Sequence, residues 1–386
     1  MGPVHHHADR QYDSALGSQP AQGILRSQLM STDTKLNAPL RPEGDSDHLT
    51  GKVLPRWAPA ASMVIALGLG VLVLLTGVTI VGLAWWVVAL LAFLLIYAGW
   101  TFSVEGRRHA TDRLATALVY LTAAAAILPL AWILITVIVQ GLSVMNLEFL
   151  TSTMRNVNPR TEGGGIFHAI IGTLTQVGIA TIISVPIGIL TSIYLSEYGT
   201  GRLARSITFF VDVMTGVPSI IAGMFIYTMW ILTLGFPQSG FAAGLALSIL
   251  MIPVVVRASE EMLKIVPNEL REGALALGVP KYKVILKIVI PTAISGIITG
   301  VMLAVARVTG ETAPLLLTTF LAQDVNWNAF SGSQASLPTF IWDQIARGTQ
   351  ASLDRAWGGA FALIFIVLLF YSGARILAAI YAPKER

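Results

Sequence analysis

The segment EGALALGVPKYKVILKIVIP (residues 272–291) decides the fold of this chain, because it sets a basic, helix-forming stretch between two long apolar runs. Several charges so close together would be costly at membrane depth, so we predict that the segment is a cytoplasmic loop. Gly278, followed by Val279 and Pro280, predicts the end of one helix and a turn. A second helix is expected to begin near Lys281. The loop is therefore predicted to be a short helix-turn-helix on the membrane surface.

The composition predicts an all-α polytopic membrane protein. Hydrophobic residues make up 54% of the chain and charged residues only 12%, and the mean hydropathy is +0.71, which excludes a large soluble domain. The sequence contains no cysteine, so neither disulfides nor thiolate metal sites are expected. The net charge of +4 is a signal of topology and gives no reason to expect a nucleic-acid partner.

The N-terminal part is predicted to add a tail and a hairpin to the main membrane-spanning core. Residues 1–55 are polar and lack apolar periodicity, which is typical of a disordered cytoplasmic tail. Residues 57–102 form an almost uncharged stretch long enough for two spans, with a turn expected at 77–82. We assign residues 56–113 to this additional transmembrane hairpin and the charged cytoplasmic loop after it.

Six further spans bring the expected total to about eight transmembrane helices. Residues 114–165 should hold the first core span and an external loop, and residues 166–386 the permease core with its loop at 272–291. The expected core spans are 114–141, 166–195, 207–234, 241–256, a long segment from 288, and 358–381.

The lysines test this topology. With both termini in the cytoplasm, every lysine falls on the cytoplasmic side, as the positive-inside rule requires. They are Lys35, Lys52, Lys264, Lys281, Lys283, Lys287 and Lys384.

Two charges lie inside an apolar segment that is too long for one straight span. Between residues 288 and 322 the only ionisable side chains are Arg307 and Glu311. A straight helix of that length would measure about 50 Å against a hydrocarbon core of about 30 Å. Gly310 and Pro314 are the expected breaking points. Exposed backbone at a break is tolerated in protein or beside water, which points to the lining of a pathway.

Arg307 and Glu311 are four residues apart, so we expect them on one helix face, where each partly neutralises the other. In a transport pathway, the guanidinium would meet an oxyanion through paired N–H donors, and the carboxylate would accept a hydroxyl proton or hold the arginine. The alternative is an ion pair that only fixes helix packing or a contact between subunits.

The loop resembles the EAA loop of bacterial ATP-binding-cassette importer permeases. It has Glu272, then Ala274 and Gly278, and it ends in a hydrophobic-x-hydrophobic-Pro pattern at 288–291, while Gly273 replaces the usual second small alanine. Three other stretches look like the A-type permease of bacterial phosphate-specific transporters. These are GGGIFHAIIGTL (163–174), TGVPSIIAGMF (215–225) and ARVTGETAPLLLT (306–318), and the resemblance covers roughly residues 114–383.

The resemblance implies the permease of a type I importer (MetI-like) for inorganic phosphate in a bacterial inner membrane. It implies three partners: a homologous C-type permease, a dimer of ATP-binding-cassette ATPases, and a periplasmic or lipid-anchored phosphate-binding protein. Carried over by position, Glu272, Gly273, Ala274 and Gly278 couple to the ATPase, and Arg307 and Glu311 serve transport.

We find no GxxxxGK[ST] phosphate-binding loop. The chain is therefore not expected to be an enzyme by itself or to hold a cofactor, and the partner ATPase would bind ATP and Mg²⁺.

Four alternatives stay open at this point. An importer permease of the same architecture could carry another oxyanion, such as molybdate or sulfate. A secondary anion carrier would need an inverted repeat with paired broken helices, whereas we find one broken segment. A signalling or scaffold protein would leave the intramembrane charges unexplained. The basic loop could also be an ordinary amphipathic cytoplasmic loop.

Overall fold

The computed structural model describes residues 54–55, 57–75 and 83–381. The chain divides into two compact units, Met1–Ala124 and Ala125–Arg386, which we describe separately. Almost all of the predicted tail (1–55) and the predicted turn (77–82) lie outside the described residues.

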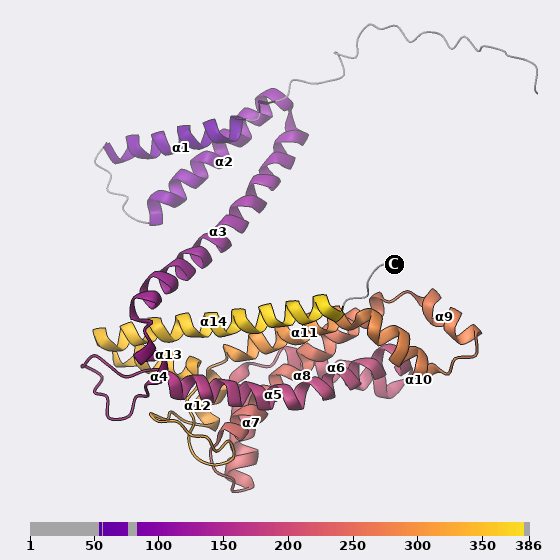
Figure 1. Ribbon diagram of the computed structural model, residues 1–386. Helices are drawn as coiled ribbons and strands as arrows, with labels where there is room; N and C mark the ends of the chain where they lie inside the picture. Colours follow the sequence, from indigo (N-terminus) through magenta and orange to yellow (C-terminus); the bar gives the residue numbers. More distant parts are fainter. Residues whose placement is uncertain (1–53, 56, 76–82, 382–386) are drawn as a thin grey trace, which may run out of the picture. The chain divides into compact units, whose positions relative to one another are not determined.

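The first unit is a helical hairpin joined by the start of a third helix (Figure 1). Its helices are α1 (Ala58–Leu75), α2 (Leu83–Glu105) and the N-terminal part of α3 (Arg107–Val144). Ala66 is buried against the rings of Phe93 and Tyr97, whose centroids lie 5.8 Å apart in a stacked arrangement. Both helices expected between 57 and 102 are therefore present, and they are apolar on most sides, as membrane helices are.

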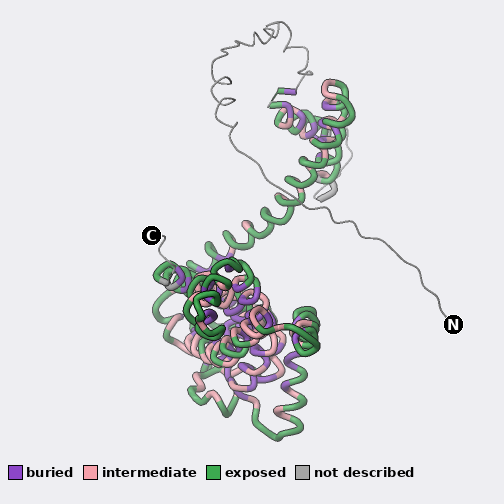
Figure 2. Tube along the Cα trace, turned by 90° about the vertical axis from the view of Figure 1, so that its right-hand side faces the viewer, coloured by how far each residue is buried: buried purple, intermediate pink, exposed green. Residues whose placement is uncertain are grey.

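The second unit is an all-helical bundle with α5 and α8 at its centre, packed against each other, while α11 lies against α8 and α14 (Figure 1). Buried residues gather inside it and its outer faces are exposed (Figure 2). A β-carbon at Gly244 would lie 2.5 Å from Ile179 Cγ2, so glycine allows α5 and α8 to approach closely. Its elements after α3 are α4 (Leu147–Thr151), α5 (Phe167–Ile193), η1 (Tyr194–Tyr198), α6 (Arg202–Thr215), α7 (Ser219–Ile226), η2 (Tyr227–Thr233), α8 (Gly240–Ile265), α9 (Asn268–Ala276), α10 (Lys281–Val284), η3 (Ile285–Val289), α11 (Ile290–Thr309), α12 (Ala313–Thr318), α13 (Leu337–Arg347) and α14 (Gln350–Tyr381).

The described residues contain six helices long and apolar enough to cross a membrane, or seven if one bent pair counts as a single span. The bent pair consists of α6 and the continuous helix formed by α7 and η2. The chain bends by 106° between them. The span predicted at 207–234 is therefore present only as this bent pair, with a break at 216–218. Pro218 explains the break, because a proline disfavours the helical conformation of the residue before it. The described apolar part of α1, Ala58–Val71, is shorter, so it is not counted among these spans.

The break predicted in the long apolar segment at 288–322 is confirmed. α11 ends at Thr309 with Gly310 as its C-cap, and α12 begins at Ala313 with Pro314 in its first turn. The polar region that follows contains α13. Ser336 and Thr339 form a reciprocal capping box at the start of α13, which satisfies the first free N–H groups of the helix.

Candidate functional site

The loop at 272–291 has the predicted helix-turn-helix form. α9 ends at Ala276, and α10 begins at Lys281. Gly278 adopts φ +75°, the left-handed conformation that favours glycine at a helix end. Its N–H donates to the Leu275 carbonyl at 2.9 Å, and the Val279 N–H donates to the Ala274 carbonyl at 3.2 Å. The glycine thus turns the chain out of α9 without leaving these backbone groups unpaired.

Arg271 anchors this loop to the membrane-spanning bundle. Its guanidinium donates to Glu197 Oε1 in η1 at 3.1 Å and to the carbonyl oxygens of Leu263 and Val266 at 2.8 and 2.6 Å. The Glu197 side chain is 6% exposed and that of Arg271 16%. Lys281 adds a bond to the Glu197 carbonyl. This anchor was not predicted from the sequence, where the only available signal was a glutamate just beyond a predicted span.

Of the four residues predicted to couple to the ATPase, one is buried and three are exposed. Ala274 is buried in a cluster with Leu263 and Val284, whereas Glu272, Gly273 and Gly278 are exposed. Glu272 has no hydrogen-bond or ion-pair partner among the described residues. It lines a cavity of about 210 Å³. Its carboxylate is therefore free to pair with a basic group of another protein.

Exposed apolar side chains lie on the same loop, and Leu275 lines the same cavity as Glu272. The Leu277 side chain is 85% exposed, and Leu275, Tyr282 and Leu286 are also exposed. A soluble partner that covered them would gain apolar burial as well as an ion pair, so the loop has the properties of a protein docking surface.

The two glycines of the loop should respond in opposite ways to alanine. We expect Gly278→Ala to destabilise the loop by about 1 kcal/mol, because an L-residue is strained at positive φ. Gly273 lies in α9, and no atom lies within 4 Å of the place that a β-carbon would take there, so Gly273→Ala should stabilise the helix by up to about 1 kcal/mol. Thermal unfolding of the purified full chain measures both. Equal effects of the two substitutions would contradict the left-handed conformation of Gly278 and the helical conformation of Gly273.

The structure places Arg307 and Glu311 on opposite sides of the helix break. Arg307 is exposed in the last turn of α11, and Glu311 is half-buried beyond Gly310. No hydrogen bond or ion pair joins them among the described residues. The predicted pair on one helix face is therefore wrong, because the helix ends at Thr309 and the four-residue spacing no longer places both side chains on one face. Their role in transport stays a prediction.

The two broken segments meet inside the bundle. α7, which follows the break at 216–218, packs against α12, which follows the break at 310–312. A β-carbon at Gly223 in α7 would lie 2.5 Å from the Cα of Pro314 in α12. The motifs at 215–225 and 306–318 are thus brought together.

A buried amide cluster lies where the segment after α12 passes between α5 and α8. Gln176 in α5 donates through Nε2 to the carbonyl and the side-chain oxygen of Gln334, both at 3.3 Å. Gln334 donates to the Asn326 carbonyl at 2.9 Å, and Thr319 donates to the Gln334 carbonyl at 3.0 Å. Nothing in the sequence indicated that Gln176 and Gln334 would be partners.

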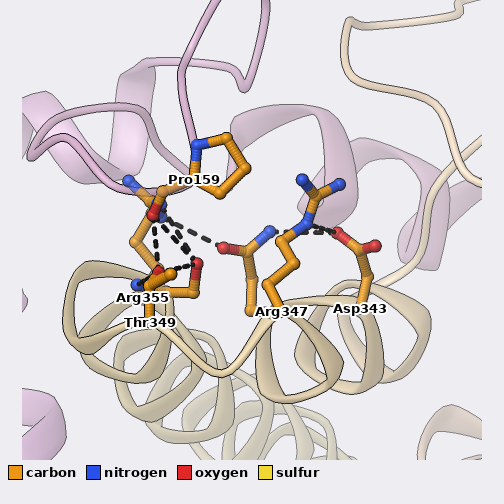
Figure 3. Close-up of polar contacts among 7 residues, drawn as sticks. Pro159, Asp343, Arg347, Thr349 and Arg355 are labelled. Atoms are coloured by element: carbon orange, nitrogen blue, oxygen red, sulfur yellow. Dashed lines mark hydrogen bonds and ion pairs between the residues drawn. The ribbon is translucent and has the colours of Figure 1, made fainter.

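A second buried cluster fixes the loop at 159–163 (Figure 3). Arg355, near the start of α14, is 3% exposed. It donates to the carbonyl oxygens of Pro159, Thr161 and Gly163 at 2.9–3.0 Å and to Gln344 at 3.1 Å. Its partners are mostly backbone carbonyls, which no residue pattern could have identified.

Comparisons with known proteins agree with this geometry. The family model of binding-protein-dependent transport system inner membrane components matches residues 184–386. The phosphate transport system permease protein PstA 1 of Mycobacterium tuberculosis is 45% identical over 281 residues, which cover 72% of this chain and 91% of that protein. The PstA permease of Haemophilus influenzae is 39% identical over 262 residues, covering 68% and 91%.

A solved structure supports the fold. A chain from a bacterial alginate ABC transporter, in complex with an alginate-bound periplasmic protein, superimposes with a TM-score of 0.50 and 15% sequence identity, covering 69% of this chain and 94% of that chain. The resemblance noted from the motifs is confirmed. The chain belongs to the binding-protein-dependent transport system inner membrane components and, within them, to the phosphate transport system permeases.

Proposed function

We propose that this chain is the permease subunit of an ATP-driven importer of inorganic phosphate. The observation that carries the proposal is the anchored loop at 272–291, which presents Glu272 and exposed apolar side chains on a chain whose relatives are named phosphate transport system permeases. This combination favours an ATP-coupled permease over a self-sufficient secondary carrier, which has no need of an external docking loop.

The proposed assembly contains a homologous C-type permease, an ATPase dimer and a periplasmic or lipid-anchored phosphate-binding protein. The ATPases would bind ATP and Mg²⁺ and dock on the loop at 272–291, with both termini of this chain on the same, cytoplasmic side. Closure of the ATPases would then push on α9. Because Arg271 ties α9 to η1 and to the end of α8, that motion reaches the spans directly.

The proposed pathway runs past the place where the two broken segments meet. Helix breaks leave backbone groups that require protein or water as partners, and the packing of α7 on α12 brings two such breaks together. Arg307 lies at the edge of this region with a guanidinium suited to bidentate contact with an oxyanion. In this proposal Arg307 and Glu311 act separately, the arginine on the anion and the carboxylate as an acceptor for a protonated oxygen.

Uptake competition tests the substrate. Cells that lack their own phosphate permease and carry this chain with its partners should take up labelled phosphate at low external concentration. Excess unlabelled phosphate should suppress that uptake, whereas equal concentrations of sulfate or molybdate should leave it unchanged. If sulfate or molybdate suppressed the uptake more strongly than phosphate, that anion would be the substrate.

A further inference from the structure

The first unit contains a groove that the proposed transport function does not use. It lies between α1, α2 and the start of α3, with a volume of about 450 Å³. Met63, Phe93 and Tyr97 form one wall and Tyr120 and Leu121 another. Met63 is 38% and Tyr120 72% exposed, so the groove is open at its side.

The α3 wall follows one helix face over most of the groove. Its members recur every four residues in two neighbouring rows, 113, 117 and 121 beside 116, 120 and 124, which places them on one face of the helix: Arg113, Thr116, Ala117, Tyr120, Leu121 and Ala124. From the first to the last the helix rises by about 16 Å. That length is close to half of a hydrocarbon core about 30 Å thick. The groove therefore has the length of one leaflet of a bilayer.

One end of the groove carries positive charge and the other end is apolar. Arg113 Nη2 donates to Glu105 Oε1 at 2.6 Å, and the Glu105 side chain, which is 3% exposed, also accepts the Leu54 N–H. These bonds hold the guanidinium at the groove end. The other nitrogens of Arg113, Nε and Nη1, have no partner among the described residues.

The surroundings of Arg113 add to the positive charge. Arg107, Arg108 and His109 are exposed in the first turn of α3, and His109 lies one turn before Arg113 on the same face. At this end three arginines and a histidine stand against two carboxylates, those of Glu105 and Asp112.

We propose that this groove binds an anionic phospholipid, with one acyl chain along the α3 wall and the phosphate on Arg113. Both α2 and α3 are long and apolar enough to cross a membrane, so lipid can reach the groove beside them. Charge complementarity selects the anionic headgroup. A second copy of this chain would bring its own arginines to the same end and be repelled.

Native mass spectrometry of the purified full chain tests the proposal. The chain is offered equal amounts of phosphatidylglycerol and phosphatidylcholine, and the bound lipid is counted. We expect phosphatidylglycerol to be retained about fivefold more strongly, the preference expected for one arginine at an anionic headgroup. Arg113→Gln should remove that preference, whereas Arg107→Gln, in the same charged stretch but outside the groove lining, should keep most of it. The double variant Glu105→Gln/Arg113→Gln repeats the test without a buried unpaired carboxylate.

A groove-filling pair of variants separates a site from general surface attraction. Thr116 is exposed and lines the groove, whereas neighbouring Ala115 is exposed and does not. Thr116→Trp should reduce the binding of both lipids, and Ala115→Trp should leave it unchanged. Equal loss from Arg113→Gln and Arg107→Gln, or no loss from Thr116→Trp, would overturn the proposal. A change in oligomeric mass on Thr116→Trp would overturn it too, by showing that protein covers the groove.

Discussion

Replacing Arg271 with glutamine is expected to abolish phosphate uptake while the chain still inserts in the membrane. Arg271 is the only described side chain that bonds α9 to both η1 and the end of α8. Glutamine cannot reproduce the guanidinium fork, and it leaves the buried Glu197 carboxylate without its cation. Breaking a buried pair in this way costs about 3 to 5 kcal/mol, so α9 should detach and ATPase motion should no longer reach the spans.

Two measurements check this result. Uptake of labelled phosphate reports transport, and co-purification of the ATPase with membranes reports docking. The double variant Glu197→Gln/Arg271→Gln removes the buried charge, so it should regain much of the lost thermal stability but little of the uptake. Glu269, also on α9 but exposed and without a hydrogen bond or ion pair among the described residues, supplies the matched control: Glu269→Gln should leave both readouts unchanged. Normal uptake in Arg271→Gln would show that the anchor is not needed for coupling.

The sequence predicted the helix-turn-helix form of the loop at 272–291 well because its signals are local. Gly278 ends α9 and Pro280 precedes α10 for reasons contained in a few neighbouring residues, and the break at Gly310 and Pro314 follows from the same backbone chemistry. The small residue at Ala274 was expected in the loop, but its burial against Val284 depends on the tertiary fold.

The missed features all join residues far apart in the chain. Arg271 with Glu197, Gln176 with Gln334, and Arg355 with the loop at 159–163 each depend on which helices become neighbours. The wrong expectation for Arg307 and Glu311 has the opposite cause. The four-residue rule applies only inside one continuous helix, and the break predicted beside Glu311 removes the condition on which the pair depended.

Without Glu311 beside it, Arg307 needs another partner. Its guanidinium is exposed at the end of a membrane-spanning helix, Lys281–Thr309, with no partner among the described residues. An arginine costs about 2.5 to 3.5 kcal/mol at a helix centre on insertion scales and less near a helix end. Water in a pathway, the transported anion or a second permease can each supply the partner that the described part of this chain does not.

We expect Arg307→Gln to lower phosphate uptake about ten- to hundredfold at low external phosphate, the loss expected from one charge-assisted hydrogen bond. Arg307→Lys should retain part of the uptake, because lysine keeps the charge but not the planar fork. Arg375, an exposed arginine in α14, gives the control, and Arg375→Gln should transport normally. Isolation of the complex decides the mechanism. Lost uptake with intact stoichiometry places Arg307 on the pathway, because only the moving anion is then deprived of its partner. If uptake is lost and the second permease is also missing from the isolated complex, the guanidinium lies at the subunit interface instead.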